Sequence, residues 1–248
     1  MVTGHHPRPS LQSYRWVTNF SGQMHHQRVQ LSAVASRPSI HPSMPPLGPI
    51  VQRDTQTMLR QVKAQWGGVS DLWVFGYASL IWRPEFEFEE HRPAHLRGYH
   101  RALKMWSRVN RGTPECPGLV FALLSGGSCK GIVYKVPKAR AARALELLWE
   151  REMPTGVYDP KWLACETLDG TVKALTFTLS RKSPNFTGQL ETSTYRQIFE
   201  KSQGRFGSTL DYAKQTFECL QKVGIHDKEL GRLLALATPA HAGGPDSP

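Results

Sequence analysis

The sequence predicts an α+β fold in which helices pack around a small mixed β-sheet, open or closed into a barrel. Short apolar stretches with strand character occur at residues 72–75, 95–107, 118–124 and 131–136. A hairpin is indicated at residues 162–179, where two alternating apolar stretches flank Asp169-Gly170, a pair typical of a type I′ turn. Helical patterns lie before, between and after these stretches, so strands and helices neither alternate strictly nor segregate cleanly.

The first element is expected to be a short helix in "RDTQTMLRQVKAQW", residues 53–66. Met58, Leu59 and Val62 share one side of that helix, and Gly67-Gly68 ends it. The buried strand at residues 72–75 follows.

Glycines interrupt the strands that come next. "HLRGYHRALKMWS" (95–107) predicts a strand with a bend at Gly98. "GLVFALL" (118–124) predicts a strand that is closed by the turn "SGGS", and "GIVYKV" (131–136) predicts a separate strand after that turn.

The remaining helices carry their own start signals. Pro137 is expected in the first turn of the helix "KARAARALELLWERE". Ser208 and Asp211 form a capping box for "TLDYAKQTFECLQKV", and Asp227 caps "KELGRLLALA". Apolar residues recur at helical spacing in the first of these helices: Ala141, Ala144, Leu145 and Leu148.

Three segments are expected along the chain. Residues 1–52 form a disordered extension rich in Pro, Ser and His, residues 53–238 form the folded domain, and residues 239–248 form a loose tail. The extension contains Arg and Ser and no acidic residue, a composition that resembles a transit peptide. A start codon assigned too far upstream, with Met44 or Met58 as the later start, is the alternative.

Composition narrows the class of protein. The chain has 248 residues, 40% of them hydrophobic, but no apolar run of the ~18 residues that a membrane span needs. Four cysteines without a C-x-x-C pair argue against a zinc site or redox dithiol and indicate a reducing, cytoplasmic compartment. We therefore expect a soluble protein with no membrane partner and no metal, and a monomer because no heptad repeat is present.

The net charge of +11 is unevenly distributed. Five arginines in residues 1–53 account for five of these charges, which leaves +6 for the rest of the chain. Basic residues in that remainder are scattered and do not alternate with aromatic residues, as they would in a protein that binds single strands. Nucleic acid is therefore not expected as a partner.

The stretch "LWVFGYASLIW", residues 72–82, is the first candidate for a functional site. It begins as a buried strand and then breaks into Gly76, Tyr77, Ala78 and Ser79. A strand that ends in small residues exposes successive backbone N–H groups, which can bind a carboxylate or an oxyanion. A tight structural turn is the alternative explanation, and the glycines of a dinucleotide- or phosphate-binding loop are missing.

The second candidate is "LLWEREMPTGVYDPKW", in which Glu150 and Glu152 bracket Arg151 at the end of a helix. Glu150 is expected in solvent. Glu152 lies among apolar neighbours at the exit from a buried helix, so its pKa should be raised. A general base and acid near neutral pH requires such a raised pKa. A helix-end salt bridge with Arg151 or Lys161 is the alternative.

Several segments occur in one order between residues 72 and 237: "FGYASLIWRPEFEF", "LRGYHRALKMWS", "RGTPECPGLVFALLSGGSCKGIVYKV", "LLWEREMPTGVYDPKW" and, more weakly, "GSTLDYAKQT" with "LQKVGIHDKEL". Together they resemble the ChaC family of γ-glutamylcyclotransferases, with greater likeness to its bacterial-type branch. The resemblance implies a small β-barrel with flanking helices. It also implies cleavage of glutathione into 5-oxoproline and cysteinylglycine without a cofactor.

The same resemblance implies roles for individual residues. The catalytic glutamate of the family falls on Glu152, and Tyr158 and Tyr212 match positions that line the pocket. In the mechanism that follows, the γ-glutamyl α-amine attacks its own γ-amide carbonyl and Glu152 moves the protons. The expected substrate-binding loop comprises Val74, Phe75, Gly76, Tyr77, Ala78, Ser79 and Leu80.

Ala78 departs from the family pattern, which has Y-G-S-L where this chain has Tyr77-Ala78-Ser79-Leu80. If position 78 needs a positive φ, alanine costs roughly 1 kcal/mol there. Two alternatives stay open: a cyclotransferase that acts on other γ-glutamyl amines or amino acids, and a catalytically weak binding or regulatory homologue.

Overall fold

The computed structural model describes residues 52–237, so the expected boundaries at residues 52 and 238 and the character of both flanking segments stay predictions. The helices are α1 (Thr55–Trp66), α2 (Ser79–Trp82), α3 (Lys138–Glu152), α4 (Thr192–Lys201), α5 (Thr209–Lys222) and α6 (Lys228–Ala235). The strands are β1 (Leu72–Gly76), β2 (Glu90–Ser107), β3 (Gly118–Val136), β4 (Asp159–Thr167), β5 (Gly170–Thr178), β6 (Gln203–Gly204) and β7 (Gly207–Ser208).

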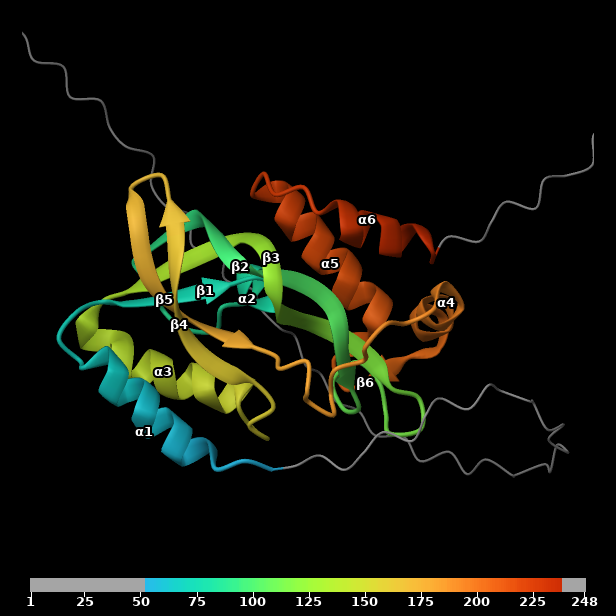
Figure 1. Cartoon of the computed structure of the whole chain (residues 1–248), viewed down its shortest axis with the longest axis horizontal. Helices are drawn as coiled ribbons and strands as arrows, with labels where there is room; N and C mark the ends of the chain where they lie inside the picture. The colour runs from blue at the N-terminus through green and yellow to red at the C-terminus, as the bar shows by residue number, and fades with distance from the viewer. Residues whose placement is uncertain (1–51, 238–248) are drawn as a thin grey trace, which may run out of the picture. The chain divides into compact units, whose positions relative to one another are not determined.

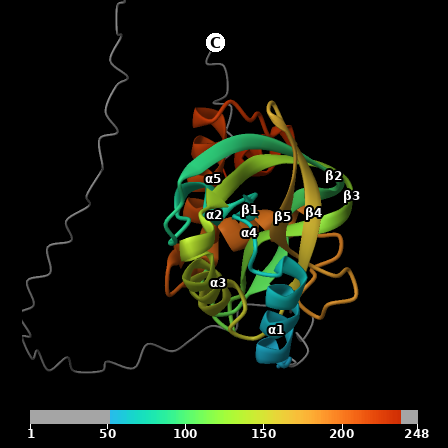
Figure 2. The same ribbon diagram turned by 90° about the vertical axis from the view of Figure 1, so that its left-hand side faces the viewer.

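Five of these strands close into a barrel in the order β1-β3-β2-β4-β5. The barrel is mixed, because β1 runs parallel to β5 at Val74 and Leu175 and antiparallel to β3. Helices α1 and α3 lie together on one side of the barrel, and α4, α5 and α6 lie on another (Figures 1 and 2). The expected α+β class, with a small mixed barrel and flanking helices, is confirmed.

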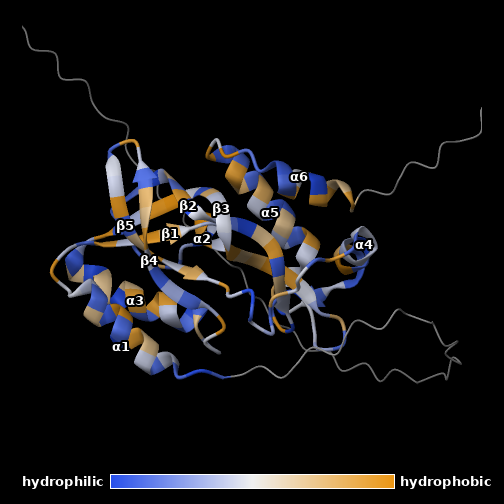
Figure 3. Cartoon of the chain, viewed as in Figure 1, coloured by the Kyte–Doolittle hydropathy of each residue, from blue (hydrophilic) through white to orange (hydrophobic). Residues whose placement is uncertain are grey.

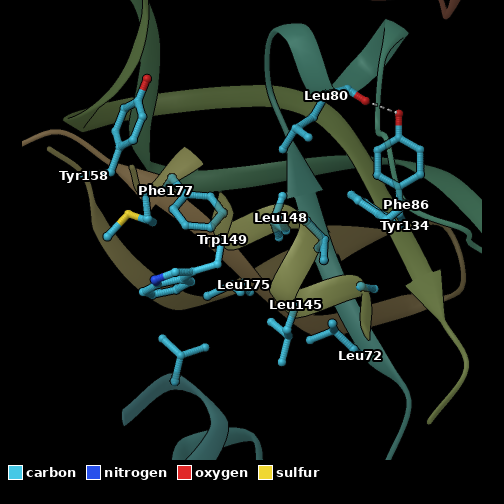
Figure 4. Close-up of a cluster of buried hydrophobic side chains, with 14 of the residues drawn as sticks. Leu72, Leu80, Phe86, Tyr134, Leu145, Leu148, Trp149, Tyr158, Leu175 and Phe177 are labelled. Atoms are coloured by element: carbon cyan, nitrogen blue, oxygen red, sulfur yellow. Dashed lines mark hydrogen bonds between the residues drawn. The ribbon is translucent and has the colours of Figure 1, made fainter. Parts of the chain in front are cut away.

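The main core lies between the barrel and the helices α1 and α3. Strand β1 is largely hydrophobic along its length (Figure 3), and its side chains meet those of α3 and β5 (Figure 4). Each large apolar side chain buried in this way contributes about 1.5–3 kcal/mol. The core includes Leu59, Val62, Leu72, Val74, Leu145, Leu148, Leu175 and Phe177.

The expected turn "SGGS" is wrong, because β3 runs without a break from Gly118 to Val136. Gly126 and Gly127 have φ of 93° and 71°, and they lie opposite Gly98 of β2, where the pairing register shifts. Two glycines therefore face one across the ladder, which is the geometry of a β-bulge rather than of a chain reversal. The bend expected at Gly98 is confirmed.

The expected hairpin is confirmed, but its turn is not type I′. Thr167 pairs with Gly170, so the two-residue loop consists of Leu168 and Asp169. Gly170 has φ of 110°, whereas neither loop residue has a positive φ, as a type I′ turn requires at both positions. A positive-φ glycine directly after a two-residue turn is typical of a bulged hairpin.

The expected start and stop signals are confirmed for α1, α5 and α6 but not for α3. Ser208 Oγ accepts a hydrogen bond from the backbone N–H of Asp211 at 3.0 Å, and Asp227 Oδ1 accepts one from Leu230 at 3.0 Å. Gly67 ends α1 with φ of 75°. Pro137 lies just before the first residue of α3 and not within its first turn.

Gly76 ends β1 at the point where α2 packs back against the strand. A Cβ atom on Gly76 would lie 2.9 Å from the Cβ of Leu80 and 3.3 Å from the ring of Tyr134. The Tyr134 hydroxyl donates to the carbonyl oxygen of Leu80 at 2.9 Å (Figure 4), so neither neighbour is free to move away.

We expect Gly76→Ala to lower the free energy of unfolding by about 1–3 kcal/mol, because the added methyl group overpacks this contact. Chemical denaturation of the full chain measures the change. Gly231→Ala is the matched control, since its Cβ would lie 3.6 Å from the Phe217 ring, an ordinary contact within a helix. That change should stabilise by about 0.5–1 kcal/mol. Equal stability of the two variants would contradict the packing argument.

Candidate active site

Tyr77 and Ala78 connect β1 to the short helix α2. In the part of the chain from residue 52 to 237, the backbone N–H groups of Tyr77, Ala78 and Ser79 donate no hydrogen bond. Three consecutive free N–H groups can receive an anion or a developing negative charge. The carbonyl oxygens of the connection are occupied: that of Tyr77 accepts from Arg101 at 2.9 Å and that of Ala78 accepts from Ile81 at 2.8 Å.

The missing side chain at Gly76 is required by the packing of Leu80 and Tyr134, and its assignment as a substrate-binding residue stays a prediction. Ala78 has φ of −144°, so the cost expected for an alanine at a positive φ does not arise. The methyl group of Ala78 is buried, which leaves its effect on a substrate as a prediction.

The loop residues that precede and follow this connection turn their side chains inward. Val74 and Leu80 belong to the hydrophobic core, and Phe75 is fully buried. Together with Gly76, these residues can offer a ligand only their backbone. Their assignment as substrate-binding residues therefore stays a prediction, and it is limited to main-chain atoms.

Glu152 is the last residue of α3, and 16% of its side chain is exposed. Its Oε1 lies 3.0 Å from Arg151 Nε, so the helix-end salt bridge considered as the alternative is present. The same guanidinium lies 2.8 Å from Glu85 Oε2 and donates to Ser79 Oγ at 2.9 Å. Arg151 thus joins the candidate base to the β1–α2 connection, whereas Glu150 is exposed, as expected.

Opposing effects set the pKa of Glu152. Burial raises this pKa above the usual value of a glutamate, and the charge of Glu85 adds to the increase. The charge and hydrogen bond of Arg151 act in the opposite direction without cancelling the increase. The result is a carboxyl group suited to accept and return a proton.

Three buried tyrosines interact electrostatically with this carboxyl group: Tyr77, Tyr158 and Tyr212. Burial raises the pKa of each hydroxyl, and the charge of Glu152 adds to all three increases, so each lies within electrostatic reach of Glu152. The Tyr158 hydroxyl points away from the apolar cluster in Figure 4. The predicted residues Tyr158 and Tyr212 are therefore within electrostatic reach of Glu152, and their roles as substrate-binding residues stay predictions.

Sequence reasoning missed a buried ion pair that supports the site. Arg101 of β2 lies 2.6 Å from Asp227 Oδ2, and their side chains are 6% and 14% exposed. The Arg101 guanidinium also donates to the carbonyl oxygens of Tyr77 and Lys130, at 2.9 and 3.1 Å. Asp227 was identified only as a helix cap, and no local pattern links it to a residue 126 positions away.

Other features of the described residues lie apart from this group or add nothing to it. Two open surface pockets of about 460 and 290 Å³ share Gln65, Pro160 and Lys161 and contain none of the predicted site residues. Between residues 52 and 237, no three His, Cys, Asp or Glu side chains are grouped as metal ligands, and no helix has the length and apolar character of a membrane span.

Comparison with known protein families shows which family this chain belongs to. The family model described as ChaC-like protein matches residues 72–239. The chain belongs to this family. Its fold is similar to that of a glutathione-specific γ-glutamyl cyclotransferase from yeast, with a TM-score of 0.62, 22% identity, and coverage of 68% of this chain and 96% of that one.

Two members of the family are similar in sequence. The glutathione-specific γ-glutamylcyclotransferase of Escherichia coli K12 is 35% identical over 164 residues, which cover 66% of this chain and 71% of the relative. The human glutathione-specific γ-glutamylcyclotransferase 1 is 30% identical over 163 residues, 64% and 73% of the two chains. The expected family resemblance is therefore confirmed.

We expect Arg151→Gln to raise the pKa of Glu152 further, because the nearby cation that favours the carboxylate is removed. Titration of the Glu152 carboxyl carbon by NMR measures this, with Glu152→Gln to assign the signal. Arg143→Gln is the control on the same helix, since Arg143 is exposed and pairs with Glu146. An unchanged or lower pKa in Arg151→Gln would show that Arg151 does not act on this carboxyl group.

Proposed function

We propose that this protein is a γ-glutamylcyclotransferase that degrades glutathione to 5-oxoproline and cysteinylglycine. The supporting observation is the buried carboxyl group of Glu152, which Arg151 connects to the hydroxyl of Ser79, next to the free N–H groups at the start of α2. The names of the bacterial and human relatives supply the substrate, glutathione.

The reaction needs no nucleophile from the protein, because the substrate contains its own. The γ-glutamyl α-amine attacks the γ-carbonyl carbon, a C–N bond closes the five-membered lactam, and the C–N bond to cysteine breaks. The α-ammonium loses two protons in this process, and the leaving nitrogen gains two as it changes from an amide to an ammonium. A single carboxyl group that alternates between base and acid can carry both protons, which contributes about 10²–10⁴ in rate.

The remaining requirement is geometric and electrostatic. Folding the γ-glutamyl chain into a cyclising conformation accounts for up to ~7–11 kcal/mol in well-oriented intramolecular reactions. The tetrahedral intermediate carries an oxyanion, which the N–H groups of Tyr77, Ala78 and Ser79 can stabilise. In this proposal the hydroxyls of Tyr158 and Tyr212, both within electrostatic reach of Glu152, donate further hydrogen bonds to the substrate.

We expect Glu152→Gln to lower 5-oxoproline release by about 10²–10⁴-fold without loss of fold, because the amide is isosteric and cannot accept the proton. The measurement is release from glutathione by the purified full chain, with circular dichroism as the test of folding. Glu150→Gln removes an exposed carboxyl group two residues away and should keep most of the activity. Full activity in Glu152→Gln, or equal loss in both variants, is incompatible with the assigned role.

A cyclotransferase for other γ-glutamyl amines is the second candidate, because Ala78 adds a buried methyl group at the β1–α2 connection. We expect the wild-type chain to turn over glutathione faster than γ-glutamyl-alanine. Comparison of kcat/KM for the two substrates distinguishes the two candidate functions. A preference for γ-glutamyl-alanine would support the second candidate. The expected monomeric state, cytoplasmic location and absence of a cofactor are part of the proposal.

A further inference from the structure

Arg111 differs from Arg83 and Arg151 near the site, because no carboxylate of the described residues lies within ion-pair distance of it. Arg83 pairs with Glu85, and Arg151 pairs with both Glu85 and Glu152. Among residues 52–237, Arg111 forms no ion pair. A guanidinium in this position is available to an anion from outside the protein.

A buried guanidinium without a carboxylate partner costs free energy. Arg111 is only 9% exposed, its Nη1 donates to the carbonyl oxygen of Phe206, and its guanidinium lies 4.8 Å from the centre of the Tyr212 ring. Asp211 attracts it only at longer range, and the Asp211 carboxylate accepts a hydrogen bond from Ser208 Oγ at 2.7 Å. A buried charge is normally paired, and the planar fork of an arginine matches a carboxylate.

A rigid frame holds the backbone of Arg111. Its N–H donates to Ser107 Oγ at 3.0 Å. A Cβ atom on Gly118 would lie 2.0 Å from the Arg111 carbonyl oxygen, and one on Gly204 would lie 2.6 Å from the Arg111 nitrogen. The chain approaches this residue so closely on both sides that its position is fixed before any ligand binds.

Tyr212 connects Arg111 to the candidate base. The Tyr212 ring lies against the Arg111 guanidinium, and its hydroxyl lies within electrostatic reach of both Glu152 and Arg151. Arg111 is therefore stacked on an aromatic residue whose hydroxyl is within electrostatic reach of the candidate base.

We propose that Arg111 binds the glycyl carboxylate of glutathione. The proposal rests on the function argued above and names the residue that selects the tripeptide. Glutathione has two carboxylates, and the α-carboxylate is attached to the carbon that carries the attacking amine, so it lies beside Glu152 and Arg151. The glycyl carboxylate lies roughly 7 Å beyond the reacting amide, the length of two extended residues. That separation suits a cation on the far side of Tyr212.

The test compares two substrates that differ only in this carboxylate: glutathione and its glycine monoethyl ester. The full chain is assayed for 5-oxoproline as wild type, Arg111→Gln and Arg111→Lys. Arg205→Gln is the matched control, because Arg205 is an exposed arginine that stacks on the Phe206 ring at 4.4 Å.

We expect the wild type to prefer glutathione over the ester. Arg111→Gln should lower kcat/KM for glutathione by roughly 10- to 100-fold, as loss of a charged hydrogen bond does, and should leave the ester almost unchanged. Arg111→Lys should lower kcat/KM for glutathione less than Arg111→Gln does, because lysine keeps the positive charge although it lacks the planar guanidinium. Arg205→Gln should keep the wild-type ratio of the two substrates.

An equal loss for both substrates in Arg111→Gln would assign Arg111 to the α-carboxylate or to bracing of Tyr212 and would overturn the proposal. An unchanged ratio would overturn it as well. Calorimetric binding of the two compounds to the same proteins decides the question independently of turnover. If the wild type binds glutathione more tightly than the ester but releases no 5-oxoproline, the proposed function fails while this inference stands. Arg111→Lys serves if Arg111→Gln does not fold.

Discussion

The buried ion pair between Arg101 and Asp227 fixes three parts of the molecule relative to one another. Arg101 belongs to barrel strand β2, Asp227 caps helix α6, and the Arg101 guanidinium also holds the carbonyl oxygen of Tyr77. Removal of one partner from such a pair costs about 3–5 kcal/mol, so these parts cannot shift independently. The N–H groups that follow Tyr77 therefore keep a constant direction. Stabilisation of a developing charge depends on donors that need not reorient.

A second constraint acts on Glu152. A carboxyl group buried without a partner would hold its proton too strongly to act as a base, and one fully paired in solvent would release it too readily to act as an acid. Arg151 moderates the rise in the pKa of Glu152 that burial causes, and it does so while bonded to Ser79 and Glu85. Arg151 thus both holds Ser79, at the start of α2, and lowers the basicity of Glu152.

The sequence predicted what depends on neighbours along the chain and missed what depends on distant ones. Helix caps at Ser208 and Asp227 follow from patterns within four residues, and the end of a buried helix indicated Glu152. The "SGGS" segment satisfies the local rules for a turn, and only its pairing with β2 at Gly98 makes it a bulge. Arg101 was missed because its partner lies far along the chain, and the predicted roles of the loop residues still await a substrate.

The distribution of charge in the protein also matches that of the proposed substrate. Glutathione carries a carboxylate at each end and an ammonium beside one of them. Along the path from Arg111 through Tyr212 to Glu152, the protein presents a cation that no carboxylate of residues 52–237 pairs with, an aromatic ring and then a paired carboxyl group. A tripeptide bound along this path would be held at its far end while its α-amine remained beside the base. Cyclisation then requires positioning and proton transfer, and the fold supplies groups for both.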